Sequence, residues 1–313
     1  MVYHVVEGDA MKTRLPSFDP RQNMFKPGYE IAHKQDTYLK DVQLHHHDFY
    51  EVYFLMSGDV TYAIESNIYH LIPGDVLLIS PQELHQMFVQ PDMSPYERYV
   101  LWIDSELLSQ LSSPAADLSR CFDRRRDNFS NLLHLDPELR STIRSLMEAI
   151  YQESQQHLFG EDVLSAALLT SLMVQINRAA LSAVAPQAVS RSGKVISEVI
   201  SYINLHYSEP LSLDQLAERF YMSKYHLSHE FNRQIGISVY KYILKKRLLI
   251  ARQLLAQGRR PNDVYAECGF KDYPGFFRAF RSEYDIAPRE YYDSVHAENL
   301  ETAKITNFQH SIR

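Results

Sequence analysis

Three histidines and one glutamate have a spacing that could bind a metal ion or a polar ligand. His45 and His47 are two residues apart, Glu51 follows in the same β-rich run, and His85 comes in a later one. Alternate residues of a strand share a face, so His45 and His47 point together and His46 points outward. Three imidazoles and a carboxylate suit Zn, Mn, Fe or Ni. Hydrogen bonding to a ligand or to the surrounding protein, without metal, is the open alternative.

Four aromatic residues could line a pocket together with this group. Aromatic faces combined with a few polar groups suit a sugar. Each aromatic residue alone is better explained as part of a core, whereas the set is consistent with a pocket. The predicted effector site therefore consists of His45, His47, Tyr50, Glu51, Tyr53, Tyr62, His85 and Trp102.

The segment that must position these side chains, residues 31–103, has the pattern of a small β domain. Short runs such as YEVYFLM, VTYAIES and DVLLIS are separated by turn signals at residues 57–59 and 73–75. Short, regularly spaced strands with turns between them predict an antiparallel barrel or sandwich.

Two helices are predicted after the strands, from Pro137 to about Gln156 and from Asp162 to about Ser182. The second has apolar residues at every fourth position, which gives one apolar stripe. That stripe predicts either packing on the helix's own barrel or a seam between two copies of the chain. The residues that form it are Leu164, Leu168, Leu172 and Ile176, with Leu169 and Met173 beside them.

Residues 211–292 contain two helix-turn-helix patterns, and the second repeats the first at a constant offset. Such a repeat indicates one supersecondary unit used twice. Ser212, Ser223 and Asp272 are predicted helix caps, and Gly269 occupies a turn. The outward faces of the two second helices carry side chains that can contact bases or phosphates. These candidate DNA-binding residues are Tyr225, Ser228, His229, Asn232, Arg233, Tyr273, Phe277, Arg278 and Arg281.

A long helix over residues 238–258 is predicted between the two units. Twenty helical residues span about 30 Å, close to the roughly 34 Å of one DNA turn. Such a spacer would place the two reading helices in successive major grooves. Its basic cluster, Lys241, Lys245, Lys246 and Arg247, is predicted either to approach phosphates or to be a solvated face, with a buried salt bridge as the alternative for Arg247.

The C-terminal pattern resembles the AraC/XylS family of transcription regulators over about 100 residues. Base-reading positions in that family fall here at Tyr225, Ser228 and His229, and at Tyr273, Pro274, Phe277 and Arg278. Three residues depart from the usual family pattern: Pro261, Tyr265 and Asp285. The residues that carry the resemblance are Leu213, Leu216, Ala217, Ser223, Leu227, Phe231, Gly236, Tyr242, Arg247, Ala251, Leu254, Leu255, Gly269, Phe270, Phe276, Phe280, Pro288 and Tyr291.

The histidine run resembles the cupin pattern H-x-H-x3-E-x6-G…H, with Gly58 as its glycine. Sensor domains of AraC-type regulators are similar to cupins, and many keep such histidines without metal. The resemblance thus implies that no cofactor is required, and a divalent metal on His45, His47, Glu51 and His85 remains open. It also implies that a bound ligand shifts the arrangement of the two domains.

The bulk composition is consistent with these patterns. The net charge is −7, with an acidic front half and a basic stretch over 194–292, the asymmetry of a DNA-binding module joined to another domain. Cys121 and Cys268 form no metal or redox motif, so we expect reduced packing residues. We find no signal peptide and no run of about 18 apolar residues, so we expect a cytoplasmic protein without a membrane span.

The predicted fold class is α+β with several domains: a cupin-like antiparallel β-barrel with flanking helices, then an all-α domain of two helix-turn-helix units joined by a long helix. The predicted boundaries are residues 1–183 for sensing and dimerisation (barrel about 31–103, helices about 104–183), 184–193 for a linker, 194–292 for DNA binding and 293–313 for a flexible tail.

The functional hypothesis is a one-component, sequence-specific transcriptional regulator that is not an enzyme. Its expected partners are double-stranded DNA, a small-molecule effector of the sugar class, RNA polymerase and a second copy of the chain; no membrane is expected. A metal-binding cupin enzyme or a metal sensor fused to a DNA-binding domain is the alternative. A DNA-binding protein without an effector is a third.

Overall fold

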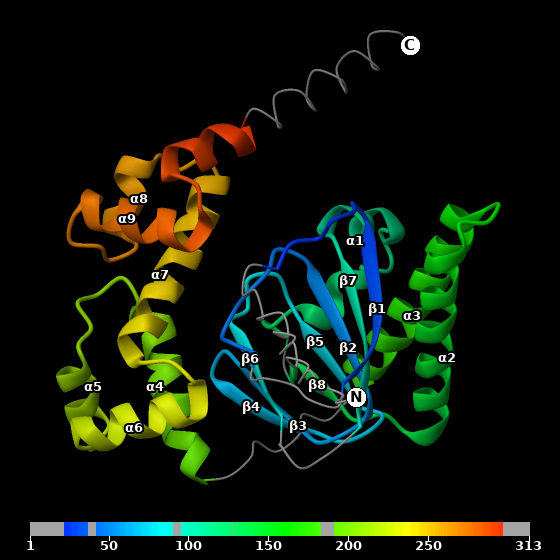
Figure 1. Cartoon of the computed structure of the whole chain (residues 1–313), viewed down its shortest axis with the longest axis horizontal. Coiled ribbons are helices and arrows are strands. Elements are labelled where there is room, and N and C mark those ends of the chain that lie inside the picture. The colour runs from blue at the N-terminus through cyan, green and yellow to red at the C-terminus, as the bar shows by residue number, and fades with distance from the viewer. Residues whose placement is uncertain (1–21, 37–41, 90–94, 127, 183–190, 297–313) are drawn as a thin grey trace, which may run out of the picture.

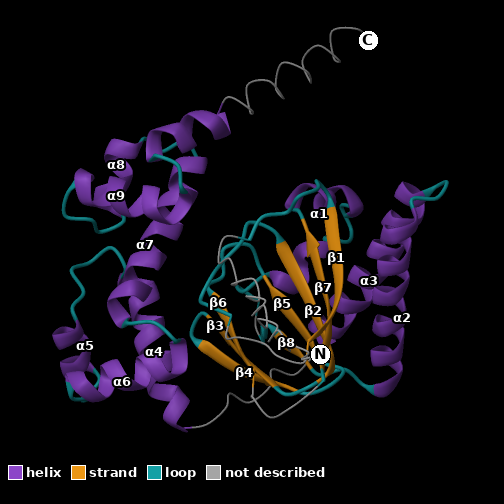
Figure 2. Cartoon of the chain, in the orientation of Figure 1, coloured by secondary structure: helices purple, strands orange, loops and turns teal. Residues whose placement is uncertain are grey.

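The computed structural model describes residues 22–36, 42–89, 95–126, 128–182 and 191–296. Within them the chain forms a β domain followed by a helical domain (Figures 1 and 2). The α+β fold class predicted from the sequence is confirmed.

Two antiparallel sheets make up the β domain. One has the strand order β1-β7-β2-β5-β8 and the other β4-β3-β6. The paired strands bring together residues far apart in sequence: Glu51 lies opposite Trp102, and Ile64 lies opposite His85. The strands are β1 (Tyr29–Asp36), β2 (Tyr50–Ser57), β3 (Val60–Ile64), β4 (Asn67–Leu71), β5 (Val76–Ile79), β6 (His85–Val89), β7 (Tyr96–Ile103) and β8 (Leu132–Leu133).

The alternation of side chains along β2 gives this domain two cores. Val52 and Phe54 face outward, into a cluster shared with the helices that follow the strands. Tyr53 and Leu55 face the space between the two sheets, where Tyr62 joins them. Because both faces of β2 are covered, its sequence YEVYFLMS is almost continuously apolar rather than alternating.

The outer face of the five-stranded sheet is covered by helices α2 (Pro137–Gln156) and α3 (Glu161–Ser182) (Figure 1). Asp136 caps α2, and Pro137 stands in its first turn, where a missing N–H is harmless. Short helices α1 (Ser105–Leu111) and η1 (Leu118–Phe122) connect strand β7 to this layer. The two helix spans predicted over 137–156 and 162–182 are confirmed to within one residue.

The apolar stripe predicted on α3 is only partly correct. Leu172 and Ile176 are buried, but Leu164 is exposed. The buried face, which packs with α2 and η1, is Ser165, Leu169, Leu172, Met173, Ile176, Asn177 and Ala180. The interpretation of α3 as a helix packed on its own barrel is therefore confirmed.

Helix α3 is also long and apolar enough to cross a membrane, judged by length and composition alone, with a mean hydropathy of 1.3. Its sequence contains no uninterrupted apolar run of about 18 residues, because small polar residues such as Ser165 and Thr170 interrupt it. Its packing against α2 gives it the ordinary role of a core helix.

Helices α4 to α9, with a further helical stretch at residues 288–296, form the described part of the C-terminal domain. Helix α7 runs between two compact groups, α4 to α6 on one side and α8 to α9 on the other (Figure 1). Their bounds are α4 (Arg191–His206), α5 (Leu213–Arg219), α6 (Lys224–Ile235), α7 (Val239–Ala256), α8 (Pro261–Glu267) and α9 (Tyr273–Tyr284).

The capping residues predicted from the sequence lie at the N-terminal ends of helices in the structure. Ser212 and Gln215 form a reciprocal capping box, and Ser223, Ser238 and Asp272 cap the helices that follow them. One prediction at the end of the chain is wrong: residues 288–296 are helical, so the expected flexible tail does not begin at 293. Of the predicted linker, residues 184–193, the first seven lie outside the described residues and the last three belong to helix α4; the tail from 297 on also lies outside the described residues.

The helical domain lies beside the sheet formed by β4, β3 and β6, on the side away from α2 and α3 (Figure 1). Helix α4 contacts strand β4 directly. The strands that carry the histidines thus lie between the helical layer α2–α3 and the C-terminal domain.

Candidate functional site

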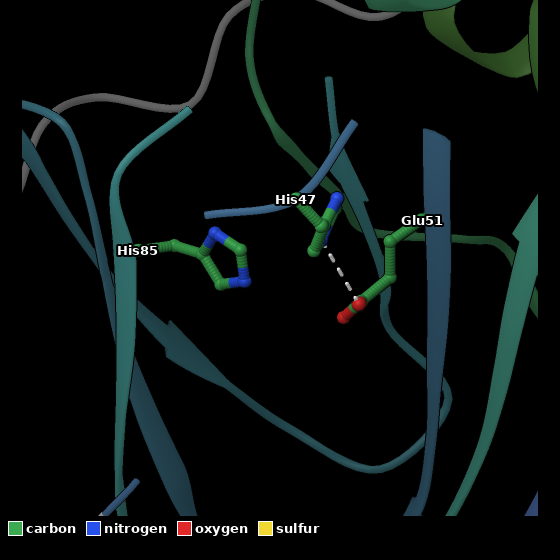
Figure 3. A group of neighbouring side chains, drawn as sticks. All are labelled: His47, Glu51 and His85. Atoms are coloured by element: carbon green, nitrogen blue, oxygen red, sulfur yellow. Dashed lines mark ion pairs between the residues drawn. The ribbon is translucent and has the colours of Figure 1, made fainter. Parts of the chain in front are cut away.

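His47, Glu51 and His85 form a buried cluster inside the β domain (Figure 3). One potential ligand atom from each lies within 4.8 Å of the other two. His47 precedes β2, Glu51 lies on β2 and His85 begins β6, so three separate segments converge. Ligand atoms bound to one ion at about 2.0–2.2 Å are at most about 4.4 Å apart, so the three residues fit a divalent metal after a small movement toward one another.

Each histidine ring is oriented by a backbone carbonyl. The Nδ1 atoms of His45, His47 and His85 lie 2.9, 2.8 and 2.8 Å from the carbonyl oxygens of Gln43, Phe49 and Glu83. A carbonyl oxygen only accepts, so each Nδ1 carries the proton, and in a neutral ring Nε2 is an acceptor. Metal-ligating histidines commonly donate their other ring N–H to a carbonyl or carboxylate oxygen in the same way.

Burial makes two of the rings hard to protonate. It lowers the pKa of His85 to about 4 and holds the pKa of His45 well below its ordinary value, with the neighbouring histidines adding to both effects. His85 is therefore neutral near pH 7. Its Nε2 is buried and has no hydrogen-bond partner among the described residues.

Glu51 supplies negative charge to the same place. Burial by itself raises the pKa of the Glu51 carboxyl, but contacts with His47 and Trp102 outweigh it and leave the pKa below its usual value. Trp102 Nε1 donates to Glu51 Oε2 at 2.8 Å, and His47 Nε2 lies 3.3 Å from the same oxygen. A buried carboxylate needs a positive partner, which a proton on His47 or a bound cation would provide.

The fourth predicted ligand, His45, is close to the cluster but not part of the three-residue set. Its ring centroid lies 4.0 Å from that of His85 and 6.4 Å from that of His47. His46 points the other way, as the alternation predicts, and its Nε2 lies 3.4 Å from the hydroxyl of Tyr284 in helix α9.

The structure separates one of the four predicted aromatic residues from the others. Tyr53, Tyr62 and Trp102 face the space between the sheets with Glu51, and the rings of Tyr53 and Tyr62 are 5.2 Å apart. Tyr50 lies on the opposite face of β2, where its ring contacts Phe122. The prediction that groups Tyr50 with the pocket is therefore wrong, because neighbouring residues of a strand face opposite ways.

Two residues that the sequence analysis missed line the same interior. Arg98 and Tyr96 lie on β7, four and six residues before Trp102, and continue its inward face. The Tyr96 hydroxyl pairs with that of Tyr53, and Arg98 pairs with Asp36 and covers the Tyr96 ring at 4.2 Å. Counting back by twos from Trp102 would have found both.

A cavity of about 160 Å³ lies where the histidine segment meets the C-terminal domain. Its walls come from both domains: His45, His46, His47 and Asp48 on one side, and Arg252, Glu283, Tyr284, Ile286 and Tyr291 on the other, with Gln22 and Asn23 at the edge. The histidine site is thus adjacent to the helical domain rather than remote from it.

Helix α6 exposes most of its predicted reading face. Tyr225 is 81% exposed, and His229, Asn232 and Arg233 are also exposed, while Ser228 is half-buried. Leu227 and Phe231 are fully buried on the opposite face. Arg233 forms an ion pair with Glu230 at 2.7 Å, so reaching a phosphate would require it to exchange partners.

Helix α9 exposes Arg278 and Arg281 but not all its predicted residues. Phe277 is half-buried, and Tyr273 packs with the rings of Tyr265, Phe276 and Phe277. These contacts hold Tyr273 in the aromatic cluster, and they leave the two arginines as the accessible polar groups.

The three departures from the family pattern are accommodated by this unit. Tyr265 packs edge-on against Tyr273 with centroids 5.9 Å apart. Pro261 is at the first position of α8, which favours proline. Asp285 ends α9 with φ +57°, a left-handed conformation that aspartate tolerates better than most residues.

The basic cluster on α7 is mostly occupied within the protein. Lys245 pairs with Glu283, Lys246 pairs with Glu65 of the β domain, and Arg247 donates to the carbonyl oxygens of Tyr207 and Glu209. Only Lys241 of the four is exposed. The expectation of phosphate contact is thus not met by Lys245 or Lys246 in this conformation, and Arg247 forms no salt bridge with any residue that the structure describes.

Comparison with known proteins identifies both domains. Residues 27–173 match the model of an AraC-like ligand binding domain, and residues 216–294 match that of a helix-turn-helix domain. Together they span most of the described chain. The chain belongs to the AraC family of transcriptional regulators. It is a DNA-binding regulator of that family with a ligand-binding domain, and its AraC-type helix-turn-helix pair is the stretch containing α5 to α9.

The chain is similar to individual transcriptional regulators. The HTH-type transcriptional regulator YbfI of Bacillus subtilis is 25% identical and covers 83% of this chain and 88% of its own. The HTH-type transcriptional activator RhaS of Escherichia coli is 21% identical, covering 80% and 87%. Among solved structures, apo ToxT from Vibrio cholerae aligns with 14% identity, 85% and 97% coverage and a TM-score of 0.37.

The cysteines of this AraC-family chain have the packing role predicted for them. Both are free and buried, and burial raises the pKa of each thiol to about 12. A thiol with so high a pKa carries almost no thiolate near pH 8 and is a poor nucleophile or metal ligand.

Proposed function

We propose that this AraC-family regulator is controlled by a small molecule bound at the Glu51–His47–His85 cluster, and that the effector is a carbohydrate. The supporting observation is a buried ring nitrogen, His85 Nε2, that has no hydrogen-bond partner among the described residues. His85 lies beside Glu51, whose carboxylate accepts from Trp102 Nε1 and has a second oxygen to offer a ligand. A sugar brings several hydroxyl donors on a compact scaffold whose apolar face can cover an aromatic ring.

A thermal-shift screen of monosaccharides against the untagged protein tests this proposal. A ligand at one hundred times its Kd stabilises the fold by about 2.7 kcal/mol, which raises Tm by roughly 5–10 °C for a domain of this size. Glu51→Gln should abolish the shift. Tyr50→Phe is the matched control, because Tyr50 lies on the opposite face of β2, and it should keep the shift. A full shift in Glu51→Gln would place the ligand elsewhere.

A second candidate is a metal-responsive regulator, favoured by the fit of the same three residues to a divalent ion. His47, Glu51 and His85 would hold the ion, and it would supply a fixed positive charge to the buried carboxylate. Elemental analysis of untagged protein, before and after exposure to a chelator, decides between the two. Stoichiometric metal that is lost in His85→Ala favours the sensor, whereas a metal-free protein that shifts with a sugar rejects it.

The proposal includes two macromolecular partners besides DNA: RNA polymerase and a second copy of the chain. Exposed apolar side chains at the turn between α2 and α3, among them Phe159 and Val163, favour a contact between copies. Sedimentation analysis of the whole chain tests dimerisation, and Phe159→Ser should weaken it. A mass that stays monomeric at micromolar concentration for the wild type would remove this part of the proposal.

A further inference from the structure

The β domain and the first helix-turn-helix unit share a single hydrophobic cluster. Leu44, Ala63 and Leu84 of the β domain are buried together with Phe231 of α6 and Tyr242 of α7. Burying such residues contributes roughly 1.5–3 kcal/mol for each large side chain. The first unit is therefore docked on the β domain and not merely tethered to it.

Glu65 lies at the centre of this docked surface. It occupies the turn between β3 and β4 with φ +48° and is 3% exposed. Lys246 Nζ donates to both of its carboxylate oxygens at 3.1 Å, and Asn204 Nδ2 donates at 2.7 Å. Asn204 is in turn fixed by the Tyr242 hydroxyl at 3.3 Å. One carboxylate of the β domain thus holds helices α4 and α7 together.

Lys246 is almost as deeply buried as its partner, at 9% exposed. Breaking a buried pair on one side leaves an uncompensated charge, which is why such pairs are specific about geometry. The pair therefore fixes where α7 lies against the β domain, whatever its net contribution to stability.

Glu65 is connected directly to the residue beside His85. Its backbone N–H donates to the Leu84 carbonyl at 2.8 Å, and its side chain accepts from the Leu84 N–H at 3.0 Å. Along Leu84-His85-Gln86 the side chains alternate. Leu84 enters the shared cluster, His85 enters the histidine site, and Gln86 lies against Gly236, where a Cβ would come within 2.5 Å of its amide nitrogen.

We propose that Glu65 is a positioning residue that holds the first helix-turn-helix unit in its docked pose, and that ligand binding at His85 weakens this hold through Leu84. The second clause rests on the function proposed above, whereas the first does not. The ligand must bind the docked and released poses unequally for this coupling to exist. Release frees Lys246 and moves an acidic domain away from the DNA-binding one, so it should raise affinity for DNA.

The test compares Glu65→Gln with Glu97→Gln in the full-length chain. Glu97 is a glutamate of β7 whose partner is His33, away from the C-terminal domain. Operator DNA is obtained by selection from a random pool. Glu65→Gln should bind it about five- to tenfold more tightly, the lower part of the usual range for coupling between sites. Amide hydrogen exchange in α4 should also become faster, and Glu97→Gln should change neither.

A double variant and a set of ligand probes complete the test. Glu65→Gln leaves the Lys246 charge buried and unpaired, which could by itself destabilise the fold. The double variant Glu65→Gln/Lys246→Met removes both charges and controls for that effect. It should keep the tighter DNA binding if Glu65 acts through position, and unchanged or weaker binding in a folded double variant overturns the proposal.

Zn²⁺ at micromolar concentration and the sugars of the thermal-shift screen serve as probes of the wild type. If none changes DNA affinity although Glu65→Gln does, the effector proposal fails and the positioning role stands. If a probe changes wild-type affinity by the same factor in Glu65→Gln, the connection through Leu84 is wrong.

Discussion

The first helix-turn-helix unit, containing α5 and α6, buries its apolar residues in a cluster that includes the β domain, whereas the second, containing α8 and α9, has a cluster of its own. Rings of Phe270, Phe276, Phe280, Tyr284 and Tyr291 form a continuous aromatic series in the second unit. Its hydrogen bond with the β domain joins His46 to Tyr284 at the end of α9, and next to it Asp48 pairs with Arg252 of α7.

This difference indicates how a signal can travel. Asp48 is 57% exposed, and ion pairs at such positions contribute little. The buried Glu65–Lys246 pair is the contact that is more specific about geometry. The β domain can therefore act on the first unit directly and on the second mainly through α7, so two units that repeat each other in sequence have different roles in regulation.

The two units should differ most clearly in their effect on the β domain when one matched core phenylalanine is truncated in each. Phe231 and Phe280 occupy equivalent positions and are both fully buried. Replacing either with alanine should destabilise its unit by about 3–5 kcal/mol. Phe231→Ala should in addition accelerate hydrogen exchange in the β domain around Leu44 and Leu84, because they share its cluster. Phe280→Ala should leave those amides protected.

Calorimetry and exchange mass spectrometry on the same samples check this prediction. Faster exchange around Leu84 in both variants would mean that the second unit is also supported by the β domain. Protection in both would mean that the shared cluster does not couple the domains.

Arg278 tests how the second unit contacts DNA. It is exposed on α9, where Tyr273 is held in the aromatic cluster. Arg278→Ala should weaken specific binding by roughly 1–3 kcal/mol and relax preference at one base pair. Arg281→Ala, if Arg281 contacts phosphate, should weaken binding to all sequences alike and reduce the salt dependence by about one ion. Binding titrations on selected and random DNA at several salt concentrations separate the two.

Much of each unit could be predicted from sequence because its signals are local. The caps at Ser212, Ser223 and Asp272 depend on residues within one turn, and so does the apolar spacing of Leu227 and Phe231. The cluster of His47, Glu51 and His85 was predictable because its spacing matches the cupin pattern, although His47 lies just before β2 and not on a strand.

The contacts between domains could not be predicted in this way. Glu65 and Lys246 are 181 residues apart in sequence, and nothing local distinguishes Lys246 from its neighbours Lys245 and Arg247. The misplacement of Tyr50 has a different cause: the alternation that puts Glu51 and Tyr53 on one face of β2 puts Tyr50 on the other, and the prediction grouped the aromatic residues without applying it.

One glycine in each unit allows the two units to be compared by adding a single methyl group. Gly236 ends α6 with φ +71°, and Gly269 lies in the turn of the second unit with φ +79°. Alanine at either position adopts a left-handed conformation at a cost of about 1–2 kcal/mol. At Gly269 its Cβ would also lie 2.5 Å from the backbone oxygen of Ser208, which cannot move away, whereas at Gly236 it meets only the end of the Gln86 side chain.

Gly269→Ala should therefore lower the Tm of the C-terminal domain more than Gly236→Ala. Gly236→Ala should instead act at the contact with the β domain: displacing Gln86 next to His85 should change the protection of β6 while the core of the first unit stays intact. Thermal unfolding and hydrogen exchange on both variants measure this. An equal loss of Tm with no change in β6 would show that Gln86 merely fills space, and that the hold on the first unit depends on Glu65 and the shared cluster alone.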